Sequence, residues 1–189
     1  MTQDGAAGGH APDDETGPAG AARAASGGAE SFDLVVESAA PADAVFALLA
    51  DGGGWASWAG PLVPRSRWHR TGTPAPGGVG AVRELGRRPM ITREEIVEFS
   101  PPRRLAYTVV SGVPVRDYLG TVDLDPLPGG GTRITWRATF VPAYRGTGRL
   151  LCLALKPAIR SIARRLARAA AVQAASPTPA GAERPSSDG

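Results

Sequence analysis

The chain has 189 residues, of which 42% are hydrophobic, and its formal net charge is +3. The single cysteine excludes an internal disulfide, and no apolar run approaches the roughly 20 residues that a membrane-spanning helix needs. The first ten residues, MTQDGAAGGH, lack the basic and apolar regions of a secretory signal. We therefore expect a cytoplasmic protein without stable membrane insertion.

The two ends differ in composition from the middle. Residues 1–30 and 174–189 are rich in Gly, Ala, Pro and Ser and carry net charges of −4 and −1. Such segments bury too little apolar surface to offset the entropy of ordering, so we predict a disordered N-terminal arm and C-terminal tail. Residues 31–173 remain as one domain with a net charge of +8. This charge could serve an anionic partner, although an arginine-rich compositional bias explains it equally well.

The predicted domain begins with a strand and two short helices. Residues Ser31–Ser38 alternate apolar and polar side chains, which is typical of a strand. Pro41 suits a first helical turn, and a short helix continues over Asp43–Leu49 until a run of glycines stops it. Trp55 and Trp58, three residues apart, indicate one further helical turn.

Six more strands follow, separated by turns rich in proline and glycine. They are expected at Arg65–Arg70, Val79–Gly86, Met90–Phe99, Leu105–Gly112, Val115–Asp125 and Thr132–Val141. In the strand Met90–Phe99, Ile91 and Ile96 fall on opposite parities, which predicts a bulge. Glu95 has the parity of Phe99 and could face inward, but the bulge leaves this facing open.

A long helix is expected over Gly148–Gln173. Its apolar residues recur every three or four positions (Leu151, Leu155, Ile159, Ile162, Leu166 and Ala170), and Pro157 should kink it. Consecutive hairpins make an antiparallel sheet, so we predict an α+β fold in which a curved sheet of six to seven strands grips the C-terminal helix. A cavity between the sheet and this helix is expected.

The sequence resembles the SRPBCC superfamily, also called START-like or helix-grip proteins, and most closely its polyketide cyclase/dehydrase and lipid transport branch. The resemblance spans about residues 32–172. It is carried by Ala40–Phe46, Trp55-x-x-Trp58, Gly77–Gly80, Pro101–Tyr107, Asp117–Val122 and Gly131–Trp136. It implies a hydrophobic pocket for a lipid-like, aromatic or polyketide molecule, without a metal or nucleotide cofactor. Only some members of the superfamily are enzymes.

Candidate ligand-binding residues are large or polar side chains on faces that are otherwise apolar: Trp58, Tyr107, Tyr118, Trp136, Phe140, Leu155, Ile159 and Ile162. Tyr107, Arg116, Tyr118 and His69 are weak candidates for catalysis. The resemblance to cyclases implies that such groups orient a polyketone and transfer protons. The competing interpretations are core packing for the aromatic residues and surface exposure for Arg116 and His69.

Other catalytic classes find little support. Cys152 lies among leucines, which indicates packing, and two histidines with one cysteine are too few for a usual metal site. Carboxylates at Glu94, Glu95, Glu98, Asp123 and Asp125 could meet across a sheet, although exposed strand faces carry the same pattern. The helix also bears a basic stripe at Lys156, Arg160, Arg164 and Arg168.

Three hypotheses remain. The first is a module that binds a small hydrophobic or aromatic ligand. The second is a polyketide cyclase or dehydratase that acts on a poly-ketone by acid/base catalysis. The third is a basic protein whose helix stripe docks to an anionic membrane or nucleic acid, but no nucleic-acid motif matches, so we expect no nucleic-acid partner. The sequence leaves the ligand and the oligomeric state open.

Overall fold

The computed structural model describes residues 28–176, so most of the predicted arm and tail lies outside the described part of the chain. The first elements are β1 (Glu30–Ser38), α1 (Ala42–Ala50), α2 (Trp55–Trp58) and a 3-10 helix, η1 (Gly60–Leu62). Six strands follow: β2 (Ser66–Arg70), β3 (Val82–Arg87), β4 (Met90–Ser100), β5 (Arg104–Ser111), β6 (Val115–Pro126) and β7 (Thr132–Pro142). The last element is the helix α3 (Gly148–Ala175).

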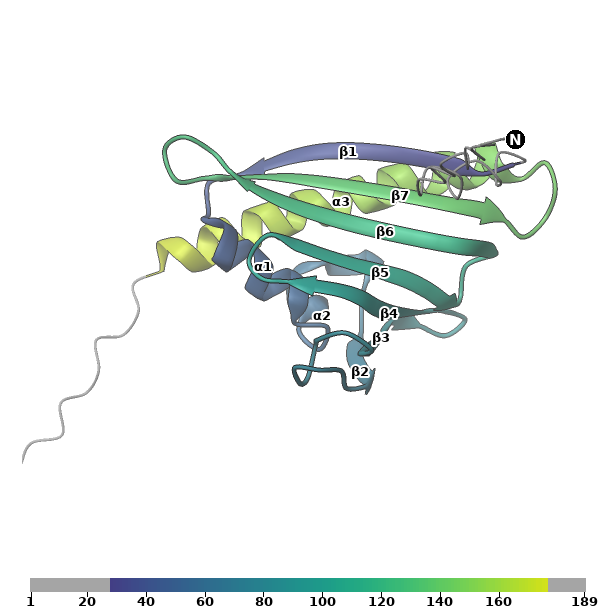
Figure 1. Ribbon diagram of the computed structural model, residues 1–189, viewed down its shortest axis with the longest axis horizontal. Helices are drawn as coiled ribbons and strands as arrows, with labels where there is room; N and C mark the ends of the chain where they lie inside the picture. The colour runs from purple at the N-terminus through teal and green to yellow at the C-terminus, as the bar shows by residue number, and fades with distance from the viewer. Residues whose placement is uncertain (1–27, 177–189) are drawn as a thin grey trace, which may run out of the picture.

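The strands form one antiparallel sheet in the order β1-β7-β6-β5-β4-β3-β2. The sheet curves, and α3 lies along its concave side next to β1 and β7, with α1 and α2 beside it (Figure 1). The predicted α+β architecture is therefore confirmed, with seven strands. Every pairing except β1 with β7 joins strands that follow one another in sequence, as the series of turns predicts.

One predicted strand begins later than expected. Val79 forms only an isolated bridge with Thr73, and Gly80 has a φ of +83°, so the chain turns there and β3 begins at Val82. The N–H of Gly80 donates to the carbonyl of Ile96, which anchors this turn to β4. The result is a shorter β3 whose inner face carries Arg83 and Leu85, both buried, and the buried Ala81 lies just before the strand.

The helix α3 buries its apolar stripe against the sheet and α1. Ile159, Leu166 and Ala170 are buried, and the hydroxyl of Ser38 donates a hydrogen bond of 2.8 Å to the carbonyl of Ala167. The helix continues through Pro157, which lies on its exposed side. Leu155 and Ile162 are only partly buried, because the first half of α3 faces the cavity described below.

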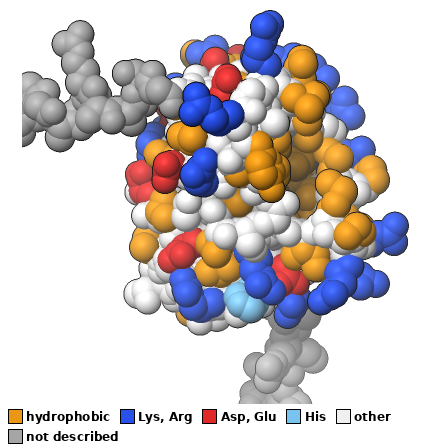
Figure 2. All heavy atoms as spheres, turned by 90° about the vertical axis from the view of Figure 1, so that its right-hand side faces the viewer, with side chains coloured by type: hydrophobic (Ala, Val, Ile, Leu, Met, Phe, Trp, Pro, Cys, Tyr) orange, Lys and Arg blue, Asp and Glu red, His pale blue; other side chains and the backbone are white. Residues whose placement is uncertain are grey.

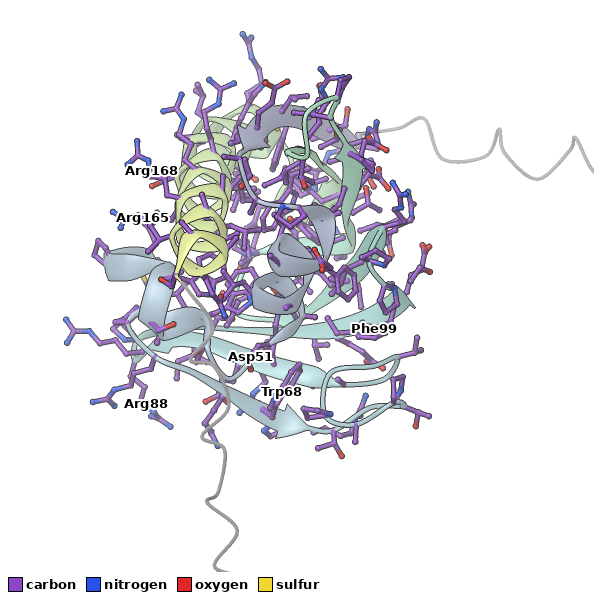
Figure 3. The ribbon with its side chains drawn as sticks, turned by 90° about the vertical axis from the view of Figure 1, so that its left-hand side faces the viewer. Asp51, Trp68, Arg88, Phe99, Arg165 and Arg168 are labelled. Atoms are coloured by element: carbon purple, nitrogen blue, oxygen red, sulfur yellow. The ribbon has the colours of Figure 1, made fainter. Side chains whose placement is uncertain are left out.

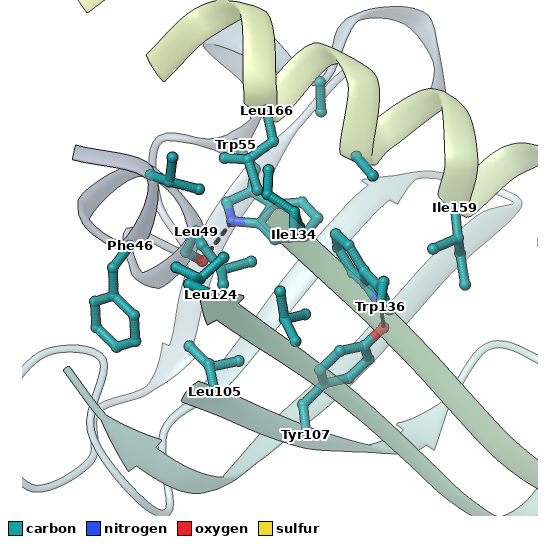
Figure 4. Packing of buried hydrophobic residues seen from close by; sticks show 14 of the residues in the cluster. Phe46, Leu49, Trp55, Leu105, Tyr107, Leu124, Ile134, Trp136, Ile159 and Leu166 are labelled. Atoms are coloured by element: carbon teal, nitrogen blue, oxygen red, sulfur yellow. Dashed lines mark hydrogen bonds between the residues drawn. The ribbon is translucent and has the colours of Figure 1, made fainter. Parts of the chain in front are cut away.

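The core is densest between the second half of α3, α1 and the centre of the sheet (Figure 4). The indole of Trp55 donates a hydrogen bond of 3.0 Å to the carbonyl of Leu49, and its ring lies 6.3 Å from that of Trp136 in an edge-to-face arrangement. Leu105, Val122 and similar side chains fill the space around them with no exposed surface. The side chains at this end of the core are therefore shielded from solvent.

The bulge predicted in β4 is present. The pairing of β4 with β5 shifts between Ile96 and Glu98, so Val97 is an extra residue and points to solvent. Ile96 and Phe99 can then both face the helical layer, where Phe99 meets Phe46 edge to face at 5.3 Å. Glu95 does not face inward: it pairs with Arg70 at 2.9 Å on the opposite face of the sheet.

Candidate functional site

An internal cavity of about 180 Å³ lies between the first half of α3 and the inner face of β3–β7. Its walls are mostly apolar, which fits the cavity that the order of elements predicts. The residues that line it include aromatic and polar side chains of the sheet and α2, and apolar side chains of α3: Trp55, Glu94, Tyr107, Tyr118, Trp136, Leu155, Ala158, Ile159 and Ile162. The helix α3 contacts β1 and β7, at one edge of the curved sheet, and the cavity lies between α3 and the inner face of the other strands.

The opening of this cavity is apolar. Leu62 and Met90 line it and are 46% and 81% exposed, so both side chains stand at the boundary with solvent. Viewed from this end, hydrophobic side chains surround a hollow and basic side chains stand around them (Figure 2). The side chains immediately at the opening are therefore apolar, as an apolar ligand requires, and the basic side chains lie outside them.

Three aromatic side chains form a polar network on one wall. The indole of Trp136 donates a hydrogen bond of 3.1 Å to the hydroxyl of Tyr107, whose oxygen lies 3.4 Å from that of Tyr118. Gly120 makes room for this arrangement, since a Cβ at that position would lie 2.4 Å from the ring of Tyr107. With its oxygen accepting from Trp136, the Tyr107 hydroxyl can direct its proton toward Tyr118 or a ligand.

Beside this network lies a buried ion pair, Arg83 on β3 with Glu94 on β4. The Nε of Arg83 donates to Oε2 of Glu94 at 2.8 Å, and Nη1 donates to the carbonyl of Leu49 at 3.3 Å. Nη2 also lies 2.8 Å from Oε2, but without the alignment of a hydrogen bond. The guanidinium stacks between the rings of Trp55 and Tyr107, at 4.1 and 4.9 Å from their centroids. The Arg83 side chain is fully buried, whereas that of Glu94 is 13% exposed and lines the cavity.

The two tyrosine hydroxyls are held neutral. Burial raises the pKa of Tyr107 well above its ordinary value of 10.0, and the neighbouring Tyr118 and Glu94 raise it further. Burial also raises the pKa of Tyr118, with Glu94 adding to the effect. Both phenols are therefore hydrogen-bond donors rather than bases at neutral pH.

These shifts predict a loss of stability in alkali. The unfolded tyrosines would ionise near pH 10, while the folded state keeps its protons to higher pH, so the stabilisation is complete below about pH 10 and declines as the pH rises above it. We expect Tyr107 and Tyr118 of the folded protein to remain protonated at about pH 11, measured by the ultraviolet phenolate signal against single Tyr→Phe variants. Ionisation of both residues near pH 10 in the folded state would contradict this.

The structure brings together six of the sequence-predicted ligand-binding residues. Tyr107, Tyr118, Trp136, Leu155, Ile159 and Ile162 all line the cavity. Phe140 is buried behind Tyr118, with ring centroids 6.2 Å apart, and Trp58 packs on Trp55 at 4.8 Å. Neither Phe140 nor Trp58 lines the cavity, so the geometry gives them a supporting place in the core.

The other two catalytic candidates lie elsewhere. His69 is exposed on β2, and Arg116 is exposed on β6, where its guanidinium donates to the carbonyl of Ala143 at 3.1 Å. Neither side chain lines the cavity, so the competing interpretation of surface exposure describes both.

Arg83 was not predicted as a site residue, and Glu94 was named only among carboxylates that could meet across the sheet, where the structure instead pairs it with Arg83. The available signal was the one that selected the tyrosines, a polar residue on an apolar strand face. Arg83 shares its parity with Ala81 and Leu85, and Glu94 shares its parity with Ile96. Because β3 starts later than predicted and β4 contains a bulge, the sequence did not show which side chains of these two strands face the helix.

A groove of about 590 Å³ runs on the surface between the start of β1 and α3. It contains Cys152, whose thiol lies 3.8 Å from the Glu30 carboxylate. Burial raises the pKa of this thiol, and the charge of Glu30 raises it further, which disfavours the reactive thiolate. Cys152 therefore has the environment of a packing residue.

The basic stripe of α3 (Lys156, Arg160, Arg164 and Arg168) is exposed. Arg168 and the neighbouring Arg165 lie on the side of the helix away from the sheet (Figure 3). No helix in residues 28–176 is long and apolar enough to cross a membrane, and these residues contain no group of three or more potential metal ligands among His, Cys, Asp and Glu.

Solved structures with this fold include several that differ widely in sequence. A protein from Nitrosospira multiformis is 20% identical, with a TM-score of 0.60 over 74% of this chain and 94% of that one. Ara h 8.0201 is 16% identical, with a TM-score of 0.62 over 76% and 98%. Norcoclaurine synthase from Thalictrum flavum is 14% identical, with a TM-score of 0.62 over 79% and 90%. These likenesses show the fold.

No curated protein matches the chain. The sequence profile of one family, however, matches residues 29–171, which span the whole sheet and nearly all of α3. The chain therefore belongs to the polyketide cyclase/dehydrase and lipid transport family, within the SRPBCC superfamily that the sequence resembles.

Proposed function

We propose that this protein binds a small apolar or aromatic molecule in the cavity between α3 and the sheet. The observation that carries the proposal is an apolar cavity of about 180 Å³ with an apolar opening and a few polar groups on one wall. This combination is typical of small-molecule sites. The norcoclaurine synthase that shares the fold has been solved with dopamine and hydroxybenzaldehyde, two single-ring aromatic molecules.

The cavity volume limits the ligand. Apolar cavities of about 150 Å³ hold one benzene molecule, and pockets for drug-sized ligands start at about 300 Å³. A cavity of about 180 Å³ therefore suits one ring or two fused rings, and a longer ligand would extend through the opening beside Leu62 and Met90.

Blocking the cavity tests the proposal. Ala158 lines the cavity, whereas Ala154, one turn earlier on α3, is exposed to solvent. Ala158→Trp should place an indole in the cavity and weaken naphthalene binding at least tenfold, measured by equilibrium dialysis, because the site is filled. Ala154→Trp, the matched control, should bind naphthalene like the unmodified protein. Equal binding by both variants, or none by the unmodified protein, would refute the proposal.

A cyclase or dehydratase is the second candidate. It is favoured by the hydroxyls of Tyr107 and Tyr118, which lie 3.4 Å apart on one cavity and can donate to the same ketone oxygen. Replacing both tyrosines with Phe should then abolish the conversion of a poly-β-ketone, measured as a change in the product profile. An unchanged profile would remove the basis of this candidate.

A further inference from the structure

Only one of the two carboxylate oxygens of Glu94 contacts Arg83. Both contacts with Arg83 fall on Oε2, and no described residue hydrogen-bonds Oε1. The side chain nevertheless stands in the cavity wall and is only 13% exposed. Oε1 therefore keeps some accessible surface, and a hydrogen-bond donor that enters the cavity can reach it. A carboxylate oxygen among mostly apolar walls is stabilised by such a donor.

The surroundings of Glu94 define the donor that would fit. A second carboxylate would be repelled by Glu94, and an ammonium group would meet the charge of Arg83, which already neutralises the pair. The Tyr107 oxygen already accepts a hydrogen bond from Trp136 and lies 3.4 Å from the Tyr118 oxygen, so the Glu94 carboxylate is the stronger acceptor for a ligand donor. A neutral hydroxyl therefore matches the site best, since it donates a hydrogen bond without adding charge.

We propose that the ligand is a neutral hydroxylated aromatic molecule whose ring fills the apolar cavity and whose O–H donates to Oε1 of Glu94. This inference rests on the proposed function, because it requires that the cavity bind a ring at all. It makes Glu94 the residue that decides specificity, while Arg83 positions its carboxylate.

The experiment compares 2-naphthol with naphthalene, which have the same ring system, in the unmodified protein and in the double variant Arg83→Met/Glu94→Leu. The double variant removes both charges together and leaves no buried charge unpaired. A hydrogen bond to a charged group corresponds to a roughly tenfold or larger gain in affinity. We therefore expect the ratio of naphthol to naphthalene affinity to be at least about tenfold higher in the unmodified protein than in the double variant. The ratio cancels any change in the cavity that affects both probes equally.

Each result has a defined meaning. The same ratio in both proteins would overturn the role of Glu94 while leaving the proposed function intact, because naphthalene would still bind. No binding of either probe would overturn both. If the double variant does not fold, 2-methoxynaphthalene replaces it: this probe keeps the oxygen but has no donor. It should bind the unmodified protein roughly tenfold more weakly than 2-naphthol, and equal binding would overturn the inference.

Discussion

Replacing Arg83 with Met should lower the free energy of unfolding by about 3–5 kcal/mol, measured by urea denaturation. The Arg83 side chain has no exposed surface, and among residues 28–176 its carboxylate partner is Glu94, which is itself 13% exposed. The variant would leave this carboxylate largely buried without its counter-charge. It would also remove the cation stacked between Trp55 and Tyr107.

The matched control is Arg133→Met. Arg133 on β7 also pairs with a glutamate on a neighbouring strand, Glu37, but the two side chains are 50% and 56% exposed. Solvent screens such a pair, so its loss should change stability by less than about 1 kcal/mol. The double variant Arg83→Met/Glu94→Leu should recover most of the loss, because it removes both charges. Equal effects of Arg83→Met and Arg133→Met would show that the buried pair has no special role.

Leu166→Ala should destabilise the protein by about 2–5 kcal/mol. Leu166 has no exposed surface and lies in the core near Trp55 (Figure 4). Its neighbours are themselves packed, so an alanine would leave a cavity that they fill only in part. Urea denaturation at constant m-value would measure the loss.

Leu153→Ala is the control on the same helix. Leu153 is 74% exposed, so its truncation removes little buried surface and should change stability by no more than about 0.5 kcal/mol. Both changes are Leu to Ala within α3, so helix propensity contributes equally to both and the difference reports burial. Similar losses at the two positions would mean that α3 does not cover the sheet through its Leu166 face.

The local elements were predictable because each depends on short-range patterning. The alternation in residues 132–141 and the three- and four-residue spacing after Gly148 identify β7 and α3 within a few residues. The same patterning selected Tyr107, Tyr118 and Trp136, each a polar or amphipathic side chain on an apolar strand face, and these residues do line the cavity.

Four candidates do not line the cavity, for different reasons. Trp58 and His69 lie in elements of four and five residues, where parity says little about facing. Arg116 lies at the start of β6, before a register shift, and Phe140 is buried behind Tyr118.

Arg83 was missed, and Glu94 was considered only as a member of a carboxylate pair, because a charged residue on a strand is normally exposed. Their burial depends on two neighbouring strands that place opposite charges 2.8 Å apart, and on the rings of Trp55 and Tyr107 that cover the Arg83 guanidinium.

The amino-acid sequence by itself determined the order of elements, the antiparallel connectivity and the apolar face of α3, because these follow from periodicity and turn residues along the chain. Only the tertiary structure decided where α3 leaves the sheet uncovered, and therefore which side chains meet at the cavity. That depends on sheet curvature, the β4 bulge and the pairing of Arg83 with Glu94, which join residues from different strands and have no signature in any single stretch of sequence.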